Sequence, residues 1–415
     1  MKQFRRVSLA ALGLALGLGV SSIVAPVAHA AETETVRSEV GKPLQAAQDL
    51  IKQQKYKEAL AKLHEAEGVK DLTAYETNVL DKLRGIAASG AGDYAAAAKS
   101  YEAVIASGRG TPAEQLKLTQ AVAGLYYQAK DFPKAITWVN RYVSDGGADP
   151  QTRTLLAQAY YLSNDFANAA KALQEQIAAE EHAGQAVPES QLQVLANSYA
   201  HQDDNAQYQA TLEKLVAAYP KHDYWVDLIH RVSARSGFAD RLQVDADRLS
   251  LAVGALTTAV QYVEFAELSL QAGLPGEAKA ILDKGYAAGI LGTGADAERH
   301  KRLHDLATKS AGEDLAALAA SEKEAAAQKD GTGLVNTGLD YVGHGQAGKG
   351  VALIEQGLQK GGLKRPDDAK LHLGLAYLAA GQKDKAVQTF KTVQGTDGTA
   401  DLARLWALTA AHSSS

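Results

Sequence analysis

Of all segments in this chain, residues 343–350 come closest to a motif that binds a ligand. They read Gly-His-Gly-Gln-Ala-Gly-Lys-Gly, which nearly matches the phosphate-binding loop, whose glycine amides and lysine surround nucleotide phosphates. Gly350 stands where that loop needs a hydroxyl for Mg²⁺, and no strand pattern precedes the segment. Because glycine is also expected in the turn of a helix hairpin, we predict no nucleotide site here.

Two other clusters contain residue types that bind metals. His300 and His304 are four residues apart and would share one face of a helix. No third ligand is evident and no glutamate follows His300 directly, so the metalloprotease motif is absent and a solvated helix face is expected. The segment 203–205 (Asp-Asp-Asn) lacks the alternating ligands and final glutamate of a calcium loop and is expected to form a polar turn.

Residues for nucleophilic catalysis are also missing. The chain has no cysteine, which excludes a thiol nucleophile, and no G-x-S-x-G sequence for a serine nucleophile. The sequence therefore predicts a protein that is not an enzyme, with no catalytic residues, no metal and no cofactor.

The most regular pattern in the chain concerns helix packing. Gly374 and Ala386 lie twelve residues apart on two expected amphipathic helices, and Tyr377 and Phe390 would fill the space between those helices. Small residues where two helices touch and aromatic residues where they diverge are typical of a helix hairpin. A small residue recurs at the equivalent position along the chain, at Ala59, Ala97, Ala135, Ala169, Ala278, Gly350 and Ala386.

This pattern resembles the tetratricopeptide (TPR) repeat, a helix hairpin of about 34 residues. The first four anchor residues are 34 to 38 residues apart. The resemblance implies an all-α fold, a TPR-like α-solenoid of stacked antiparallel helix hairpins that binds partners rather than catalysing a reaction. Composition is consistent with this fold, since only 6% of residues are aromatic and no segment alternates like a β-strand.

The first thirty residues have the features of a secretory signal peptide. Three basic residues among the first six precede an apolar segment at 7–20, and Ala-His-Ala at 28–30 supplies small residues for cleavage after Ala30. The alternative is an uncleaved anchor helix. Without cysteine, neither a lipid-modified N-terminus nor a disulfide can form. We predict a bacterial periplasmic protein with no membrane span after signal cleavage, and its negative net charge, −5 before cleavage, argues against nucleic acid as a partner.

The repeat pattern divides the chain into seven expected segments. These are a signal peptide (1–30), a polar N-terminal extension (31–43), an N-terminal TPR array (44–222), divergent TPR-like hairpins (223–296), a helical spacer (297–330), a C-terminal TPR pair (331–398), and a capping helix with a tail (399–415).

The TPR register implies a partner-binding groove lined by the first helix of each repeat. In the N-terminal array the expected groove residues are polar and mostly uncharged, which suits a peptide backbone, although they could equally be solvated residues without a partner. They are Gln120, Tyr127, Gln128, Thr154, Gln158, Tyr161, Gln193, Asn197 and His201.

In the two C-terminal repeats the same register gives an apolar stripe with i, i+4, i+7 spacing on each helix. Its residues are Val335, Leu339, Val342, Leu371, Leu375 and Leu378. An exposed stripe of this kind would bind an amphipathic helix of a partner. The alternatives are that the register is shifted by one residue or that the helix at 400–412 covers the stripe.

These features predict a non-enzymatic periplasmic TPR scaffold or adaptor that binds protein partners of a cell-envelope assembly. The resemblance includes periplasmic TPR proteins of TonB/ExbB-type transport or polysaccharide export systems, without a motif that selects either. Two alternatives remain open: a self-associating structural solenoid, and an accessory subunit of a peptidoglycan or polysaccharide enzyme.

Overall fold

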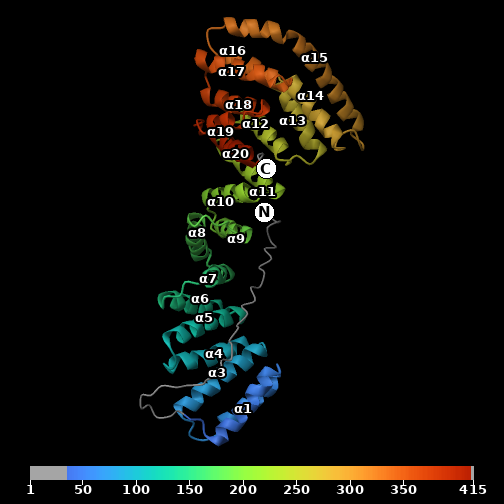
Figure 1. Ribbon diagram of the computed structural model, residues 1–415. Helices are drawn as coiled ribbons and strands as arrows, with labels where there is room; N and C mark the ends of the chain where they lie inside the picture. Colours follow the sequence, from blue (N-terminus) through green and yellow to red (C-terminus); the bar gives the residue numbers. More distant parts are fainter. Residues whose placement is uncertain (1–34, 413–415) are drawn as a thin grey trace. The chain divides into compact units, whose positions relative to one another are not determined.

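The computed structural model describes residues 35–412, and the predicted signal peptide lies outside these residues. The described chain consists of helices joined by short turns, without a β-strand between residues 35 and 412 (Figure 1). The all-α fold of stacked antiparallel hairpins is therefore confirmed. No helix in this range is both long and apolar enough to cross a membrane.

The chain divides into two compact units, residues 1–208 and 209–415, so that the division falls within α10. The first unit contains α1 (Ser38–Lys52), α2 (Tyr56–Glu67), α3 (Ala74–Gly90), α4 (Tyr94–Ala106), α5 (Pro112–Gln128), α6 (Phe132–Ser144), α7 (Pro150–Leu162), α8 (Phe166–His182), α9 (Glu189–His201) and the start of α10 (Asn205–Ala218).

The second unit contains the rest of α10 and ten further α-helices with one 3₁₀ turn. They are α11 (His222–Ser233), η1 (Asp240–Leu242), α12 (Gln243–Ala252), α13 (Ala259–Gln271), α14 (Pro275–Ala287), α15 (Ala297–Ala327), α16 (Thr332–Gly343), α17 (Ala347–Lys360), α18 (Pro366–Ala379), α19 (Lys383–Phe390) and α20 (Thr399–His412). The division of the repeats into separate arrays stays a prediction.

Short turn sequences join the two helices of three hairpins in the first unit. Three turns place a residue with positive φ directly before an aspartate N-cap: Gly92-Asp93, Lys130-Asp131 and Asn164-Asp165. Each aspartate side chain accepts a hydrogen bond from a backbone N–H in the first turn of the next helix, which satisfies a donor that the helix cannot satisfy itself. The turns are therefore encoded locally.

The small anchor residues lie where the two helices of each hairpin touch. Gly374 of α18 directly faces Phe390 of α19, so a Cβ at Gly374 would overlap the Phe390 ring. Six anchor alanines have a relative exposure of 0%: Ala59, Ala97, Ala135, Ala169, Ala278 and Ala386. The packing register that the sequence predicts is confirmed at these positions.

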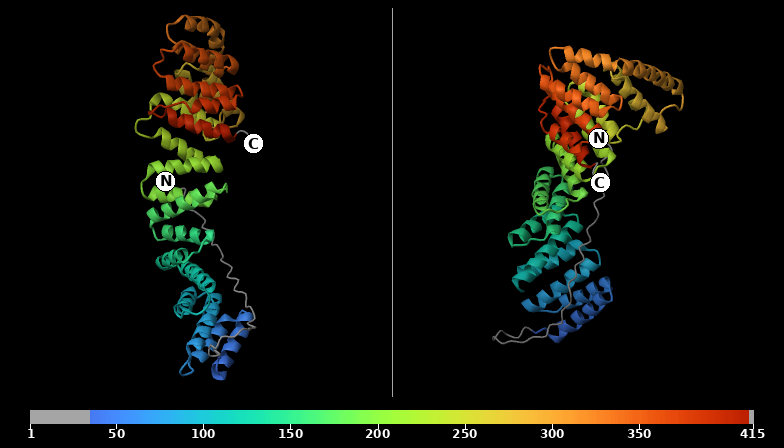
Figure 2. Two further views of the ribbon diagram at one scale, coloured as in Figure 1. Left: turned by 60° about the vertical axis from the view of Figure 1, so that its left-hand side comes forward. Right: turned by 45° about the horizontal axis from the view of Figure 1, so that its top comes forward.

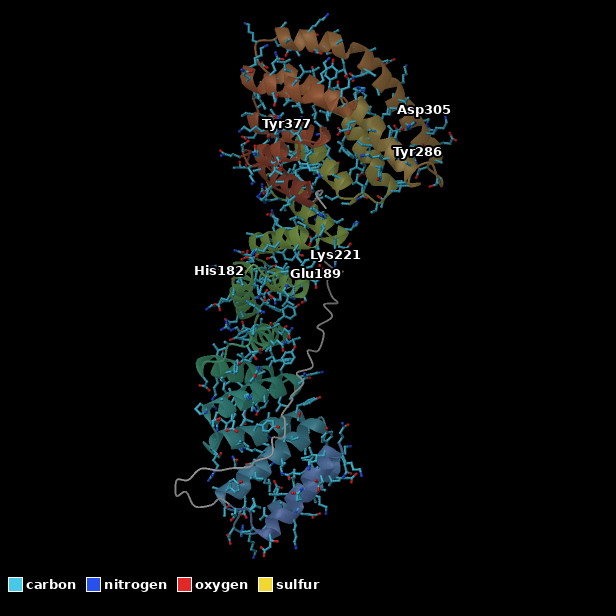
Figure 3. All side chains as sticks on the ribbon, viewed as in Figure 1. His182, Glu189, Lys221, Tyr286, Asp305 and Tyr377 are labelled. Carbon is cyan, nitrogen blue, oxygen red and sulfur yellow. The ribbon has the colours of Figure 1, made fainter. Side chains whose placement is uncertain are left out.

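In the second unit the hairpins α16–α17 and α18–α19 stack side by side (Figure 2). The 31-residue helix α15 packs along α14, where Tyr286 of α14 and Asp305 of α15 lie on neighbouring helices (Figure 3). Residues from α12 and α14 also contact this later stack. His372 of α18 lies 3.2 Å from Asp245 of α12, and Gly276 of α14 packs on the ring of His344, which directly follows α16.

This arrangement overturns the expectation of an exposed C-terminal stripe. Leu371, Val335 and Leu375 are only 0%, 5% and 9% exposed, and the other three stripe residues are half-buried. On α16, Val335 and Val342 contact the glycines of α17, Gly357 and Gly350, so this helix turns its stripe toward its own hairpin partner. On α16 the stripe therefore lies inside the hairpin, which is the outcome expected from the alternative of a shifted register.

Candidate functional site

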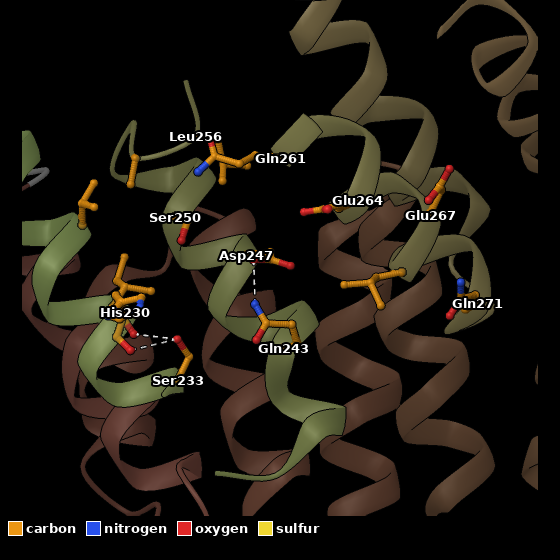
Figure 4. Close-up of a pocket in the computed structure, with 14 residues that line it drawn as sticks. His230, Ser233, Gln243, Asp247, Ser250, Leu256, Gln261, Glu264, Glu267 and Gln271 are labelled. Carbon is orange, nitrogen blue, oxygen red and sulfur yellow. Dashed lines mark hydrogen bonds between the residues drawn. The ribbon is translucent and has the colours of Figure 1, made fainter. Parts of the chain in front are cut away.

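A pocket of about 500 Å³ opens in the second unit between α11, α12 and α13 (Figure 4). Each helix contributes one face, because the lining residues follow the three-to-four-residue spacing of a helix. The lining residues are Val226, Ile229, His230 and Ser233 from α11, Gln243, Asp247 and Ser250 from α12, Ala255 and Leu256 from the following turn, and Gln261, Glu264, Glu267, Leu268 and Gln271 from α13. We call this the acidic pocket.

The charge of the acidic pocket is carried by carboxylates. Asp247 and Glu264 point toward one another across the pocket in Figure 4, and Glu267 lies one turn further along α13. None of the fourteen lining residues is lysine or arginine. Glu267 has an ion pair with Arg299 of α15 at 3.3 Å, in which both side chains are largely exposed. The pocket therefore favours a positively charged ligand group.

Asp247 is a carboxylate of the acidic pocket whose pKa lies well above its usual value. Burial, together with the negative charge of Glu264, raises the pKa of Asp247 to about 6. The hydrogen bond from Gln243 Nε2 to Asp247 Oδ1, at 3.0 Å, lowers the pKa of Asp247 because it stabilises the ionised form. A cation bound near Asp247 would favour ionisation in the same way.

The raised pKa predicts a pH-dependent effect of Asp247→Asn. An aspartate in the unfolded chain has a pKa near 3.9. Ionisation of Asp247 therefore destabilises the folded state, and this loss of stability grows as pH rises from about 4 to about 6. At about pH 7.5 the variant should be more stable than the wild type by about 1–2 kcal/mol, and this difference should vanish near pH 4. Urea denaturation at several pH values measures it, and a pH-independent difference would contradict the assigned pKa.

The other face of α12 anchors the pocket through a buried ion network. Arg248 donates to Asp245 at 2.5 Å and, through two bonds of 2.7 Å, to Glu277 of α14. His372 of α18 contacts Asp245 from the other side. Although burial acts in the opposite direction, the charges of His372 and Arg248 lower the pKa of Asp245 to about 2. The network thereby holds α12, which carries Asp247 and Gln243, against two other helices.

Three polar groove residues predicted for the first unit contact the first helix of the next repeat. Gln120 of α5 donates to the Thr152 hydroxyl of α7 at 2.9 Å, and the Tyr127 hydroxyl donates to Gln158 Oε1 of α7 at 3.1 Å. The ring of Tyr161 lies edge-on to His201 of α9, with ring centroids 6.4 Å apart.

The remaining predicted groove residues also lie on α5, α7 and α9, each of which is the first helix of its repeat. The Thr154 hydroxyl accepts from Gln176 Nε2 of α8 at 2.8 Å, and Gln193 Nε2 donates to Glu189 within α9 at 3.3 Å. Asn197 is half-buried, whereas Gln128 is exposed. Partner binding by this set of residues stays a prediction.

The motifs weighed in the sequence have structural roles. Residues 343–350 contain the turn between α16 and α17, at 344–346, and the first residues of α17, so the segment belongs to a helix hairpin as expected. The expectation of a solvated face is wrong for His300, which is buried and accepts a hydrogen bond from the Gly292 amide. His304 instead pairs with Asp283 of α14 at 2.7 Å, because α15 packs along α14.

Sequence reasoning identified neither the acidic pocket nor a cluster of Asp314, Asp340 and His344 on α15 and α16. The i, i+4 spacing of Asp340 and His344 was a usable local signal for the second. No comparable signal exists for the pocket, because its three helices meet only in the tertiary structure.

Two family models, both described as tetratricopeptide repeat, match this chain. One matches residues 82–152 and 335–401, and the other matches residues 194–222. The residues that line the acidic pocket lie between the second and third of these segments. A comparison with curated proteins finds no match.

Several solved structures are similar to this chain at low sequence identity. The TPR domain of P58(IPK) is 14% identical, with a TM-score of 0.23, over 90% of this chain and 98% of that domain. Pentatricopeptide repeat protein PPR10 from maize is 13% identical, with a TM-score of 0.32, over 87% of this chain. A chain of Naa15/Naa10 bound to HypK-THB is 15% identical, with a TM-score of 0.31, over 86% of this chain.

This chain spans only 58% of the Naa15/Naa10 chain and 60% of PPR10. At these identities the similarities concern the fold alone.

Proposed function

We propose that this tetratricopeptide repeat protein is a non-enzymatic scaffold for protein partners, and that its acidic pocket receives a basic side chain of one partner. The observation that carries the proposal is the charge of the pocket: Asp247, Glu264 and Glu267 line it without a lysine or arginine among the lining residues. A volume of about 500 Å³ accommodates one lysine or arginine side chain with its neighbouring residues.

The apolar lining supports a lysine or arginine over a small inorganic cation. Ile229, Leu256 and Leu268 offer surface for the methylene groups of a long side chain, while the carboxylates contact its charged end. A metal ion would gain nothing from these apolar residues. The polar groove residues of α5, α7 and α9, the first helices of their repeats, are proposed as a second contact surface. Their amide and hydroxyl groups would bind the backbone of an extended segment.

The proposed compartment is the periplasm, on the strength of the signal-peptide pattern of residues 1–30. The proposed setting is a cell-envelope assembly, such as a TonB/ExbB-type transport or polysaccharide export system. Cell fractionation tests the compartment, because an uncleaved anchor would retain the protein in the inner-membrane fraction. Light scattering after size-exclusion chromatography tests the alternative of a self-associating solenoid.

Labelled peptides test the pocket directly. Three peptides that share one apolar sequence carry lysine, norleucine or glutamate at the centre, and fluorescence anisotropy measures their binding. The lysine peptide should bind at least about tenfold more tightly than the norleucine peptide, since a charge-assisted hydrogen bond contributes about 1.5–3 kcal/mol. Its affinity should fall as salt is added and as pH drops below about 6, where Asp247 becomes protonated.

Charge reversal at one exposed residue distinguishes the pocket from the rest of the acidic surface. Glu264→Lys should abolish the preference for the lysine peptide, because Glu264 lines the pocket and is exposed enough to change without unfolding. The matched control is Glu324→Lys on exposed α15, which alters the net charge equally. Equal loss of binding in both variants, or equal binding of all three peptides, would refute the pocket as the binding site.

A further inference from the structure

Three potential metal ligands converge where α15 crosses α16. The His344 Nε2 atom lies 2.7 Å from Asp314 Oδ2 and 3.9 Å from Asp340 Oδ1. One ligand atom from each residue lies within 4.8 Å of the others. The side chains of His344 and Asp340 are only 7% and 13% exposed, and that of Asp314 is 27% exposed. The cluster is therefore mostly enclosed by protein.

The negative charge of this cluster is not balanced. Two carboxylates face a single imidazole, and no lysine or arginine forms an ion pair with either carboxylate within residues 35–412. Asp340 Oδ1 is buried and accepts no hydrogen bond. Leaving a buried carboxylate oxygen without a partner costs free energy, so a further positive group is expected there.

Two other histidine–aspartate pairs in the same unit provide an internal comparison. Asp283, which contacts His304 at 2.7 Å, also binds Lys279 at 2.6 Å. Asp245, which contacts His372, also binds Arg248. Each of these aspartates has a permanent cation as a second partner. In the Asp314–Asp340–His344 cluster a second carboxylate takes the place of that cation.

The backbone around the cluster holds its histidine in place. Gly276 of α14 packs directly on the imidazole, and a Cβ at this position would lie 2.8 Å from His344 Cε1. Asp340 and His344 are separated by one turn of α16, so their side chains project from the same face. A ring fixed in this way is pre-organised as a ligand, because its orientation is decided before anything binds.

We propose that Asp314, Asp340 and His344 bind one divalent transition-metal ion, with Zn²⁺ as the first candidate and water completing its coordination. One imidazole nitrogen with two carboxylate oxygens suits Zn²⁺, whereas Mg²⁺ and Ca²⁺ prefer oxygen ligands alone. The ion would join α15 to α16 and neutralise both carboxylates.

Calorimetric titration of tag-free, chelator-treated protein with ZnCl₂ tests the proposal, and elemental analysis gives the stoichiometry. About one equivalent should bind, and the melting temperature should rise with Zn²⁺ because the ion binds the folded state. His344→Gln should weaken the affinity by more than about tenfold. MgCl₂ should give no comparable binding.

The matched control is His304→Gln, which removes the imidazole of a histidine–aspartate pair that has its own lysine. It should bind Zn²⁺ as the wild type does. Asp314→Asn provides a second variant in case His344→Gln does not fold, because Asp314 is the most exposed ligand, and it should also lose more than about tenfold in affinity. Absence of binding in the wild type, or undiminished binding in both cluster variants, would overturn the proposal.

Discussion

Replacing Arg248 by methionine should lower the free energy of unfolding by about 3–5 kcal/mol, the largest effect that we expect from a single substitution in this protein. Arg248 is the only guanidinium among the partners found for Asp245 and Glu277 in the described chain. Methionine fills a similar volume but leaves Asp245, whose side chain is 4% exposed, with only the His372 imidazole as a partner. Urea denaturation followed by circular dichroism measures the loss.

Because of the same ion network, we expect Arg248→Met to weaken ligand binding in the acidic pocket as well. Arg248 lies on α12, one residue after Asp247, and links α12 to α14 through Glu277. If α12 separates from α14, Gln243 and Asp247 no longer have fixed positions and the lysine peptide should bind poorly.

Two further variants identify the cause of the Arg248 effect. Adding Asp245→Asn and Glu277→Gln to Arg248→Met removes the uncompensated charges, so part of the lost stability should return. Arg299→Met breaks the largely exposed pair with Glu267 and should cost less than about 1 kcal/mol. If Arg248→Met and Arg299→Met lowered the free energy of unfolding equally, burial of the Arg248 network would not be the reason for its effect on stability.

Gly350→Ala should destabilise the second unit by about 1–3 kcal/mol, although alanine is the better helix former. Gly350 of α17 faces Gly338 of α16, and a Cβ at Gly350 would lie 2.6 Å from the Gly338 carbonyl oxygen and 2.5 Å from Val342 Cγ2. The Gly338 carbonyl belongs to the backbone and cannot rotate away as a side chain can, so the two helices must move apart. Thermal denaturation measures the effect.

Gly312→Ala is the matched control for this prediction. Gly312 is also helical, within α15, but a Cβ there meets no atom within 4 Å. Alanine should therefore stabilise the protein by about 0.5–1 kcal/mol, as expected from helix propensity alone. If Gly350→Ala were also stabilising, close contact of α16 with α17 would not be the reason for glycine at this position.

The hairpins could be predicted from the sequence because their signals are local. The glycine or asparagine of a turn, the aspartate N-cap after it and the small residue three positions into the second helix all lie within a few residues of one another, as in Asn164, Asp165 and Ala169. Close-packed helices impose the same requirement in every repeat, so the pattern recurs and can be read without knowledge of the partner helix.

The C-terminal stripe could not be assigned to the surface or the core from its pattern. An apolar i, i+4, i+7 series reports that one helix face is buried and does not report which neighbour buries it. Val335 and Val342 turn toward the glycines of α17, where small residues let the helices approach closely. The α16 part of the stripe therefore lies in a hairpin interior rather than in a groove.

The sequence by itself determined the helical repeat fold, the turns and the small residues that the helices need at their contacts. Only the tertiary structure decided where charges gather, because α12 and α14 meet α16 and α18 across long stretches of chain. Asp245 and His372 are 127 residues apart. Ionic contacts over such separations produce no periodic pattern in the sequence, since the burial and pairing of charged residues depend on which helices meet. The acidic pocket and the cluster of Asp314, Asp340 and His344 lie between helices that are neighbours in the sequence, but they too depend on how those helices pack.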